Sequence, residues 1–161
     1  MKLRAPALFL HRWIGILAGI LLIIIGLTGS LLIFSEELDH AFNPQLLHVE
    51  PQGEMRSHQE LVDVAKTVYP NLKLHRITAP KTPDVAYTVM MVDDKNDYTN
   101  VYLNPYSGTV LGSRPQKQTI GGFLIELHVH LFAGDLGMQV VGICGGILLL
   151  MGITGLALWN G

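Results

Sequence analysis

Two long apolar blocks lie near the ends of the chain, and a stretch of mixed polar and apolar residues separates them. The first block, "WIGILAGILLIIIGLTGSLLIF", runs from Trp13 to Phe34 without a charged residue. As a helix, its 22 residues would be about 33 Å long, enough to cross a hydrocarbon core of about 30 Å. The second block, "MQVVGICGGILLLMGITGLALW", runs from Met138 to Trp159 and has the same length. The pattern predicts two transmembrane helices.

The first block is longer than the apolar core of a signal peptide, which typically has about 7–15 residues before a cleavage site. It continues directly into "SEELD", so we expect an uncleaved anchor. Positively charged residues precede this span, at Lys2, Arg4 and Arg12. Negatively charged residues follow it, at Glu36, Glu37 and Asp39. The positive-inside rule then predicts that both termini are cytoplasmic and that residues 35 to about 120 lie outside the cytoplasm.

The two spans resemble each other. "GILLIIIGLTG" from Gly19 aligns with "GGILLLMGITG" from Gly145, which matches Thr28 with Thr154. Because the helices run in opposite directions, this repeat suggests a pair related by a twofold axis in the membrane plane. A helix face lined with small residues lets another helix approach closely in lipid. The sequence leaves open which helix each such face contacts.

The periodicity between the spans predicts a small α+β domain. Ser57 and Glu60 form a capping box before a helix that Pro70 ends. Strand-like runs follow at residues 72–78, 85–92, 99–104 and 108–112, and a short strand is predicted earlier, at 46–50. The predicted fold is thus a two-span α-helical membrane protein with an inserted extracytoplasmic α+β domain. Its expected segments are a transmembrane segment at 1–38 (span about 13–34), the α+β domain at 39–117, an interfacial helix and break at 118–137, and a second transmembrane helix at 138–161.

Composition narrows the function. Charged residues make up 15% of the chain, below the roughly 25% of soluble domains, and the net charge of −2 gives no support for a nucleic-acid partner. The single cysteine, Cys144, excludes an intrachain disulfide. The sequence contains no nucleophile–base pair, phosphate-binding loop or zinc-ligand spacing, so a hydrolase is disfavoured and no catalytic residue is predicted.

Histidines beside the spans are the candidate cofactor ligands. His128 and His130 are two positions apart, which on a helix separates their directions by about 200°, so only one can face the other helices. His11 precedes the first span and His128 precedes the second, on opposite sides of a core about 30 Å thick. They cannot bind one iron. Each needs a partner from a third helix, a second copy of the chain or another histidine, and His40 is the nearest such candidate for His128.

A structural role is the alternative for these histidines. Residues 120–133 could form an interfacial amphipathic helix, with His128 and His130 near the headgroups and residues 134–137 breaking it before the span. His11 could equally be an interfacial residue beside Arg12.

The run "VYLNPYSGTVLG" after a helix and strands resembles the last hairpin of the PepSY domain. The flanks, with "LHRW" before the first span, "LH" before the second and Thr-Gly near the end of each, resemble the PepSY-associated transmembrane family over nearly the whole chain. Typical members continue beyond "TGLALW" with further spans. The resemblance therefore implies a truncated member, a fragment or a short relative that assembles with a partner.

The resemblance also implies a function. Members are bacterial inner-membrane proteins linked to iron and siderophore uptake, and some use haem b to reduce ferric siderophores in the periplasm. Carried over by motif, the axial haem ligands are His11 and His128, and no metal other than haem iron is expected. The implied partners are the lipid bilayer, further transmembrane helices from a homo-oligomer or another protein, and a ferric siderophore. Two alternatives remain: a membrane-anchored binding or inhibitory module that regulates a peptidase, and an accessory subunit of a membrane complex.

Overall fold

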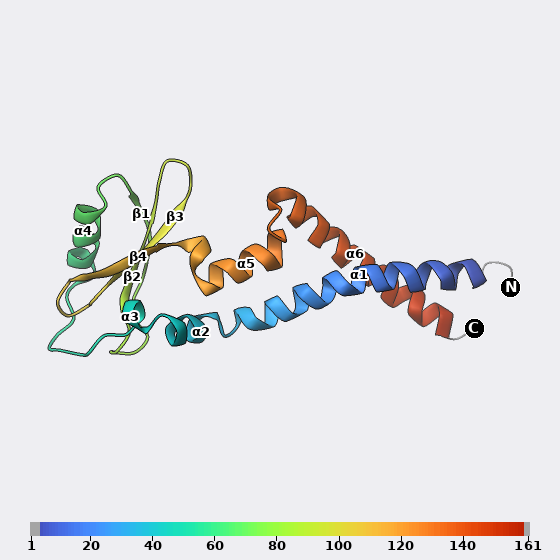
Figure 1. Cartoon of the computed structure of the whole chain (residues 1–161), viewed down its shortest axis with the longest axis horizontal. Helices are drawn as coiled ribbons and strands as arrows, with labels where there is room; N and C mark the ends of the chain where they lie inside the picture. Colours follow the sequence, from blue (N-terminus) through green and yellow to red (C-terminus); the bar gives the residue numbers. More distant parts are fainter. Residues whose placement is uncertain (1–3, 160–161) are drawn as a thin grey trace. The chain divides into compact units, whose positions relative to one another are not determined.

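The computed structural model describes residues 4–159, which form two compact units (Figure 1). One unit combines the chain before Ser35 with the chain after Phe123, and the other is Ser35–Phe123. The first is helical and the second contains the sheet.

Two long helices, α1 (Arg4–Leu32) and α6 (Gly134–Trp159), pack against each other in the first unit. Both are long and apolar enough to span a membrane. Leu17 on α1 is 66% exposed and Leu149 on α6 is 67% exposed, an arrangement suited to lipid rather than water. These features place the predicted transmembrane spans on α1 and α6.

A tight turn connects α5 (Ile120–His130) to α6. The predicted break at residues 134–137 is wrong, because these residues form the first turn of α6. The chain reverses just before them, where Leu131 and Phe132 adopt φ angles of 48° and 56°. Gly137 makes this possible: a Cβ there would lie 1.5 Å from the carbonyl oxygen of His130.

The second unit is built on an antiparallel sheet in the order β1-β2-β3-β4. The strands span Lys73–Thr78, Tyr87–Val92, Tyr98–Leu103 and Val110–Pro115. These confirm the four predicted strand regions within a few residues. All six residues of β1 are exposed, whereas β2 and β3 supply most of the core.

Helix α4 (His58–Val68) covers one face of the sheet. The capping box is confirmed, since the Ser57 side chain accepts from the Glu60 amide and the Glu60 side chain accepts from the Ser57 amide. Leu61 and Ala65 on the helix pack with apolar residues of the strands, namely Tyr87, Val89, Met91, Val101 and Leu103. The alternating pattern of the strands therefore buries one apolar face, as expected of an antiparallel sheet.

A second apolar cluster lies where the segment after α2 (Ser35–Phe42) meets Ala86 and Tyr102. The strand predicted at residues 46–50 is wrong: Pro44–Leu47 form a short helix, α3, and only His48 pairs in sheet fashion, with Val85. Proline favours the first turn of a helix, and the apolar residues after it do not distinguish helix from strand.

Candidate histidine sites on the membrane helices

His128 lies near the end of α5 and contacts the C-terminal part of α1. Its ring Nδ1 is 2.8 Å from the carbonyl oxygen of Ile25 and 3.1 Å from the hydroxyl oxygen of Thr28. Thr28 is only 6% exposed, so the contact is sheltered. The ring also lies against Gly29, where a Cβ would come within 2.8 Å of its Cε1 atom. Glycine thus provides the space that the imidazole occupies.

The hydrogen-bond partners determine the tautomer of His128. A carbonyl oxygen can only accept, so Nδ1 must carry the hydrogen that points to Ile25. The Thr28 hydroxyl lies 2.8 Å from the carbonyl oxygen of Ile24 and donates to the backbone of its own helix, which leaves its oxygen to accept from the ring. In the neutral ring, Nε2 therefore holds the lone pair.

His11 forms the matching contact at the other end of the helix pair. It lies on α1, and its Nδ1 is 2.9 Å from the hydroxyl oxygen of Thr154 on α6. That hydroxyl lies 2.8 Å from the carbonyl oxygen of Leu150, to which it donates, so it accepts from His11. A Cβ on Gly155 would lie 3.6 Å from the ring, an ordinary contact distance.

The two sites are thus reciprocal: the histidine before each span contacts the Thr-Gly pair near the end of the other span. This is the symmetry expected of an antiparallel pair related by a twofold axis. His11 and Thr28 are 17 residues apart on α1, which puts the two sites about 25 Å apart. A single iron cannot bind both rings.

His130 has a different environment. Its Nδ1 lies 3.6 Å from the Glu126 carboxylate on the same helix, and this nitrogen makes no hydrogen bond within the described part of the chain. His40, the histidine considered as a second ligand beside His128, lies on α2 in the sheet-containing unit. Within residues 4–159, no three His, Cys, Asp or Glu side chains come together as a metal-binding group.

Each site offers one imidazole whose Nδ1 is hydrogen-bonded, which is the form that an axial haem ligand would need. A ligating histidine usually donates one ring N–H to a fixed acceptor and binds metal through the other nitrogen, and His11 and His128 both have this form. Each site supplies one imidazole, so a bis-histidine haem needs a second ligand at the same depth. Thr28 and Thr154 were not predicted as hydrogen-bond partners of the histidines. The sequence shows both Thr-Gly pairs, but it leaves open how the helices pack.

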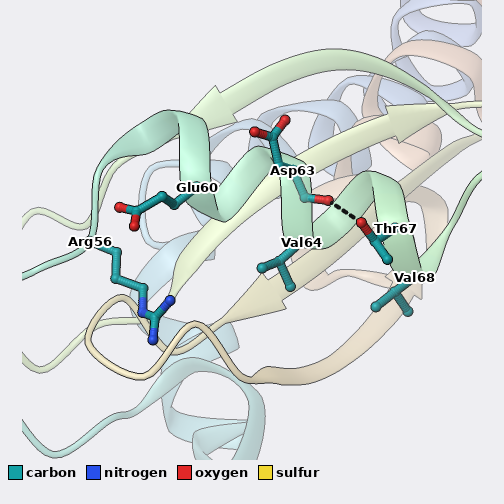
Figure 2. A pocket seen from close by; sticks show the side chains of 6 residues that line it. All are labelled: Arg56, Glu60, Asp63, Val64, Thr67 and Val68. Carbon is teal, nitrogen blue, oxygen red and sulfur yellow. Dashed lines mark hydrogen bonds between the residues drawn. The ribbon is translucent and has the colours of Figure 1, made fainter.

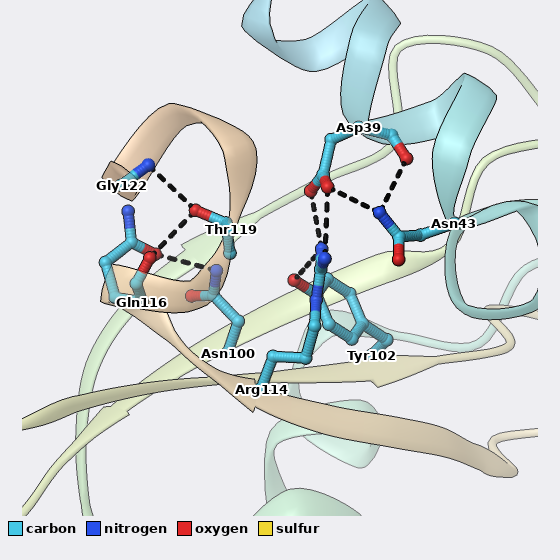
Figure 3. A network of polar contacts seen from close by, with 8 residues as sticks. All are labelled: Asp39, Asn43, Asn100, Tyr102, Arg114, Gln116, Thr119 and Gly122. Carbon is cyan, nitrogen blue, oxygen red and sulfur yellow. Dashed lines mark hydrogen bonds and ion pairs between the residues drawn. The ribbon is translucent and has the colours of Figure 1, made fainter. Parts of the chain in front are cut away.

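Polar groups of the sheet-containing unit form a separate network (Figure 3). The Asp39 carboxylate on α2 pairs with the Arg114 guanidinium on β4 through contacts of 3.0 and 2.5 Å. Arg114 also donates to the Tyr102 hydroxyl at 3.0 Å. Burial lowers the pKa of Arg114, but its hydrogen bonds to Asp39 and Tyr102 outweigh this and raise the pKa overall. This network attaches α2 to the sheet and contains no acid–base pair poised for catalysis.

A shallow hollow of about 380 Å³ lies along α4, and Figure 2 shows its lining: Arg56, Glu60, Asp63, Val64, Thr67 and Val68. The Thr67 hydroxyl donates to the backbone carbonyl of Asp63, and Arg56 donates to the carbonyl of Tyr106. The hollow contains neither a histidine nor a cysteine, and its charged groups are those of an ordinary solvated helix face.

Two transmembrane helices with an α+β domain inserted between them define the class of this chain as a membrane-anchored protein with an extramembrane module. The family described as the PepSY-associated TM region matches residues 8–161, and the chain belongs to this family. No curated protein matches the chain.

Proposed function

We propose that this protein is a bacterial inner-membrane component of iron uptake in which His11 and His128 are axial ligands of haem b. The observation that carries the proposal is the shared form of the two rings, each held through Nδ1 by a threonine of the opposite span. When bound, haem b supplies one-electron transfer, the chemistry that converts a ferric siderophore to its ferrous form. The positive-inside charge pattern supports cytoplasmic termini and a periplasmic sheet domain.

Two haems rather than one follow from the separation of about 25 Å between the histidine sites. Each haem takes its second ligand from another helix at the same depth, in a second copy of the chain or in a partner protein. The apolar surfaces of α1 and α6 that α1–α6 packing leaves exposed are available for such helices.

The test is the visible absorption spectrum of detergent-purified protein from haem-replete cells, before and after dithionite. We expect a reduced b-type band that decreases in His11→Ala and in His128→Ala and is lost in the double variant. His130→Ala is the matched control, because the ion pair described for its ring is with Glu126 of its own helix and no contact to a Thr-Gly pair is described for it, and we expect an unchanged band. A colourless wild-type protein, or a band that the double variant retains, refutes the haem assignment.

A second candidate function, a peptide-binding module, is favoured by strand β1. This edge strand is exposed at all six positions, and Leu74 and Ile77 are 41% and 40% exposed. An exposed edge can accept an extended peptide as an additional strand. Arg76 on this strand would favour an acidic segment, such as one from a peptidase that the module inhibits.

Crosslinking from a photoreactive residue placed at Ile77 tests this alternative in intact cells. Capture of a peptidase, reduced by Arg76→Glu but not by Lys95→Glu in the exposed β2–β3 loop, supports the binding module. Absence of any captured peptidase refutes it.

A further inference from the structure

The Thr-Gly pairs near the ends of the spans have a specific relation to the histidines. Thr28 and Thr154 each donate their hydroxyl hydrogen to their own helix backbone and present the oxygen to the histidine that precedes the other span. Packing alone does not require a hydroxyl at this position, since valine has nearly the same shape.

We propose that Thr154 is a positioning residue that holds His11 as the Nδ1–H tautomer, so that Nε2 presents its lone pair. At His128 the Ile25 carbonyl is the main acceptor for Nδ1–H, and Thr28 is a second, weaker acceptor for the same hydrogen. That this lone pair serves haem iron rests on the function proposed above, whereas the tautomer is a property of the protein without haem. Neither threonine contacts the iron in this arrangement, because each acts through the ring nitrogen remote from the metal.

The two sites differ in how strongly they depend on threonine. Thr154 is the only hydrogen-bond partner of the His11 ring among the described residues. His128 also has the carbonyl oxygen of Ile25 at 2.8 Å, slightly closer than Thr28 at 3.1 Å. Loss of the threonine hydroxyl should therefore release His11 but leave His128 largely held.

This difference gives a test by nitrogen NMR of ¹⁵N-histidine-labelled apoprotein in detergent, at a pH where the rings are neutral. The wild-type protein should show His11 and His128 as Nδ1–H. In Thr154→Val, His11 should become a mixture with the Nε2–H form that free histidine prefers, while His128 stays unchanged. In Thr28→Val, His128 should remain mainly Nδ1–H.

Two further variants separate positioning from general damage. Thr154→Ser restores the hydroxyl and should return His11 to the Nδ1–H form. Ser30→Ala removes a hydroxyl on α1 whose hydrogen bond among residues 4–159 goes to the carbonyl of Gly26, and it should change neither ring. Nε2–H signals for His11 in the wild type, or an unchanged His11 tautomer in Thr154→Val, overturn the proposal even if a variant folds poorly.

A redox titration of haem-loaded protein adds a second readout. Loss of an acceptor for Nδ1–H makes the imidazole a weaker donor to iron, so Thr154→Val should raise the midpoint potential of the haem at His11. The Thr28→Val shift at His128 should be smaller, and equal shifts at both sites would contradict the proposed difference. If the apoprotein tautomers are as expected but no haem is found, the proposed function fails and the positioning role remains.

Discussion

The Asp39–Arg114 ion pair attaches α2 to the sheet and should make a large contribution to the stability of its unit. The two side chains are only 13% and 14% exposed. Asp39→Ala leaves the Arg114 guanidinium sheltered, with the Tyr102 hydroxyl as its remaining described partner. Removal of one member of a buried pair costs about 3–5 kcal/mol, and residual water access favours the lower end, about 3 kcal/mol.

Hydrogen–deuterium exchange in detergent measures this loss, with peptides from β3 and β4 as the reporters. A destabilisation of about 3 kcal/mol corresponds to roughly 150-fold faster exchange of amides that exchange through unfolding of the unit. Replacement of both partners, Asp39→Leu with Arg114→Met, should restore much of the protection, because no buried charge is left unpaired.

The Lys73–Asp94 pair provides the matched control. Its side chains are 75% and 84% exposed, so Asp94→Ala should change exchange of the same peptides far less. Comparable acceleration in Asp39→Ala and Asp94→Ala would show that burial does not determine the strength of these pairs, and the reasoning would be refuted.

Three smaller predictions follow from local geometry. Gly29→Ala should displace the His128 ring and lower the thermal unfolding midpoint in detergent, with an overpacking cost of about 1–3 kcal/mol. Gly155→Ala should be tolerated, because a Cβ there has room. Equal effects of the two substitutions would contradict the close packing at Gly29. Ser57→Ala should destabilise α4 by about 1 kcal/mol, measured by exchange of a peptide from that helix, and an unchanged rate would exclude a stabilising cap. The hydrogen bonds from Ser57 lower the pKa of Glu60 in the folded protein. The ionised Glu60 side chain therefore stabilises the fold at neutral pH, and this stabilisation is lost as the pH falls through the pKa of Glu60 in the folded protein. Glu60→Gln should remove this pH dependence.

Local patterns predicted most of the fold. The charge-free blocks identify α1 and α6, and the strand periodicity and the Ser57–Glu60 box identify most of the sheet domain. The turn before α6 was misplaced because Leu131 and Phe132 adopt left-handed φ angles that their residue types disfavour. Gly134 also has a positive φ, of 56°, but the two left-handed residues before it are not glycines, and Gly137 permits the close approach within the first turn of α6.

The candidate site was predicted only in part. His128 was distinguished from His130 by helical spacing and family motif, and the separation of His11 from His128 followed from the span length. Their threonine partners depend on the antiparallel register of two spans more than a hundred residues apart, which one sequence does not specify. The repeated Thr-Gly pair singled out Thr28 and Thr154 in the sequence, but it did not show which residues they contact.

The two reciprocal histidine contacts also restrict insertions and deletions in α1. An alanine inserted in α1 between His11 and Thr28 would rotate one contact relative to the other by about 100° and move it by about 1.5 Å. Both contacts could not then form on an undistorted helix. The length of α1 between them therefore sets the lengthwise offset of the helix pair, and a one-residue insertion is a more disruptive change there than the loss of any single apolar side chain that faces lipid.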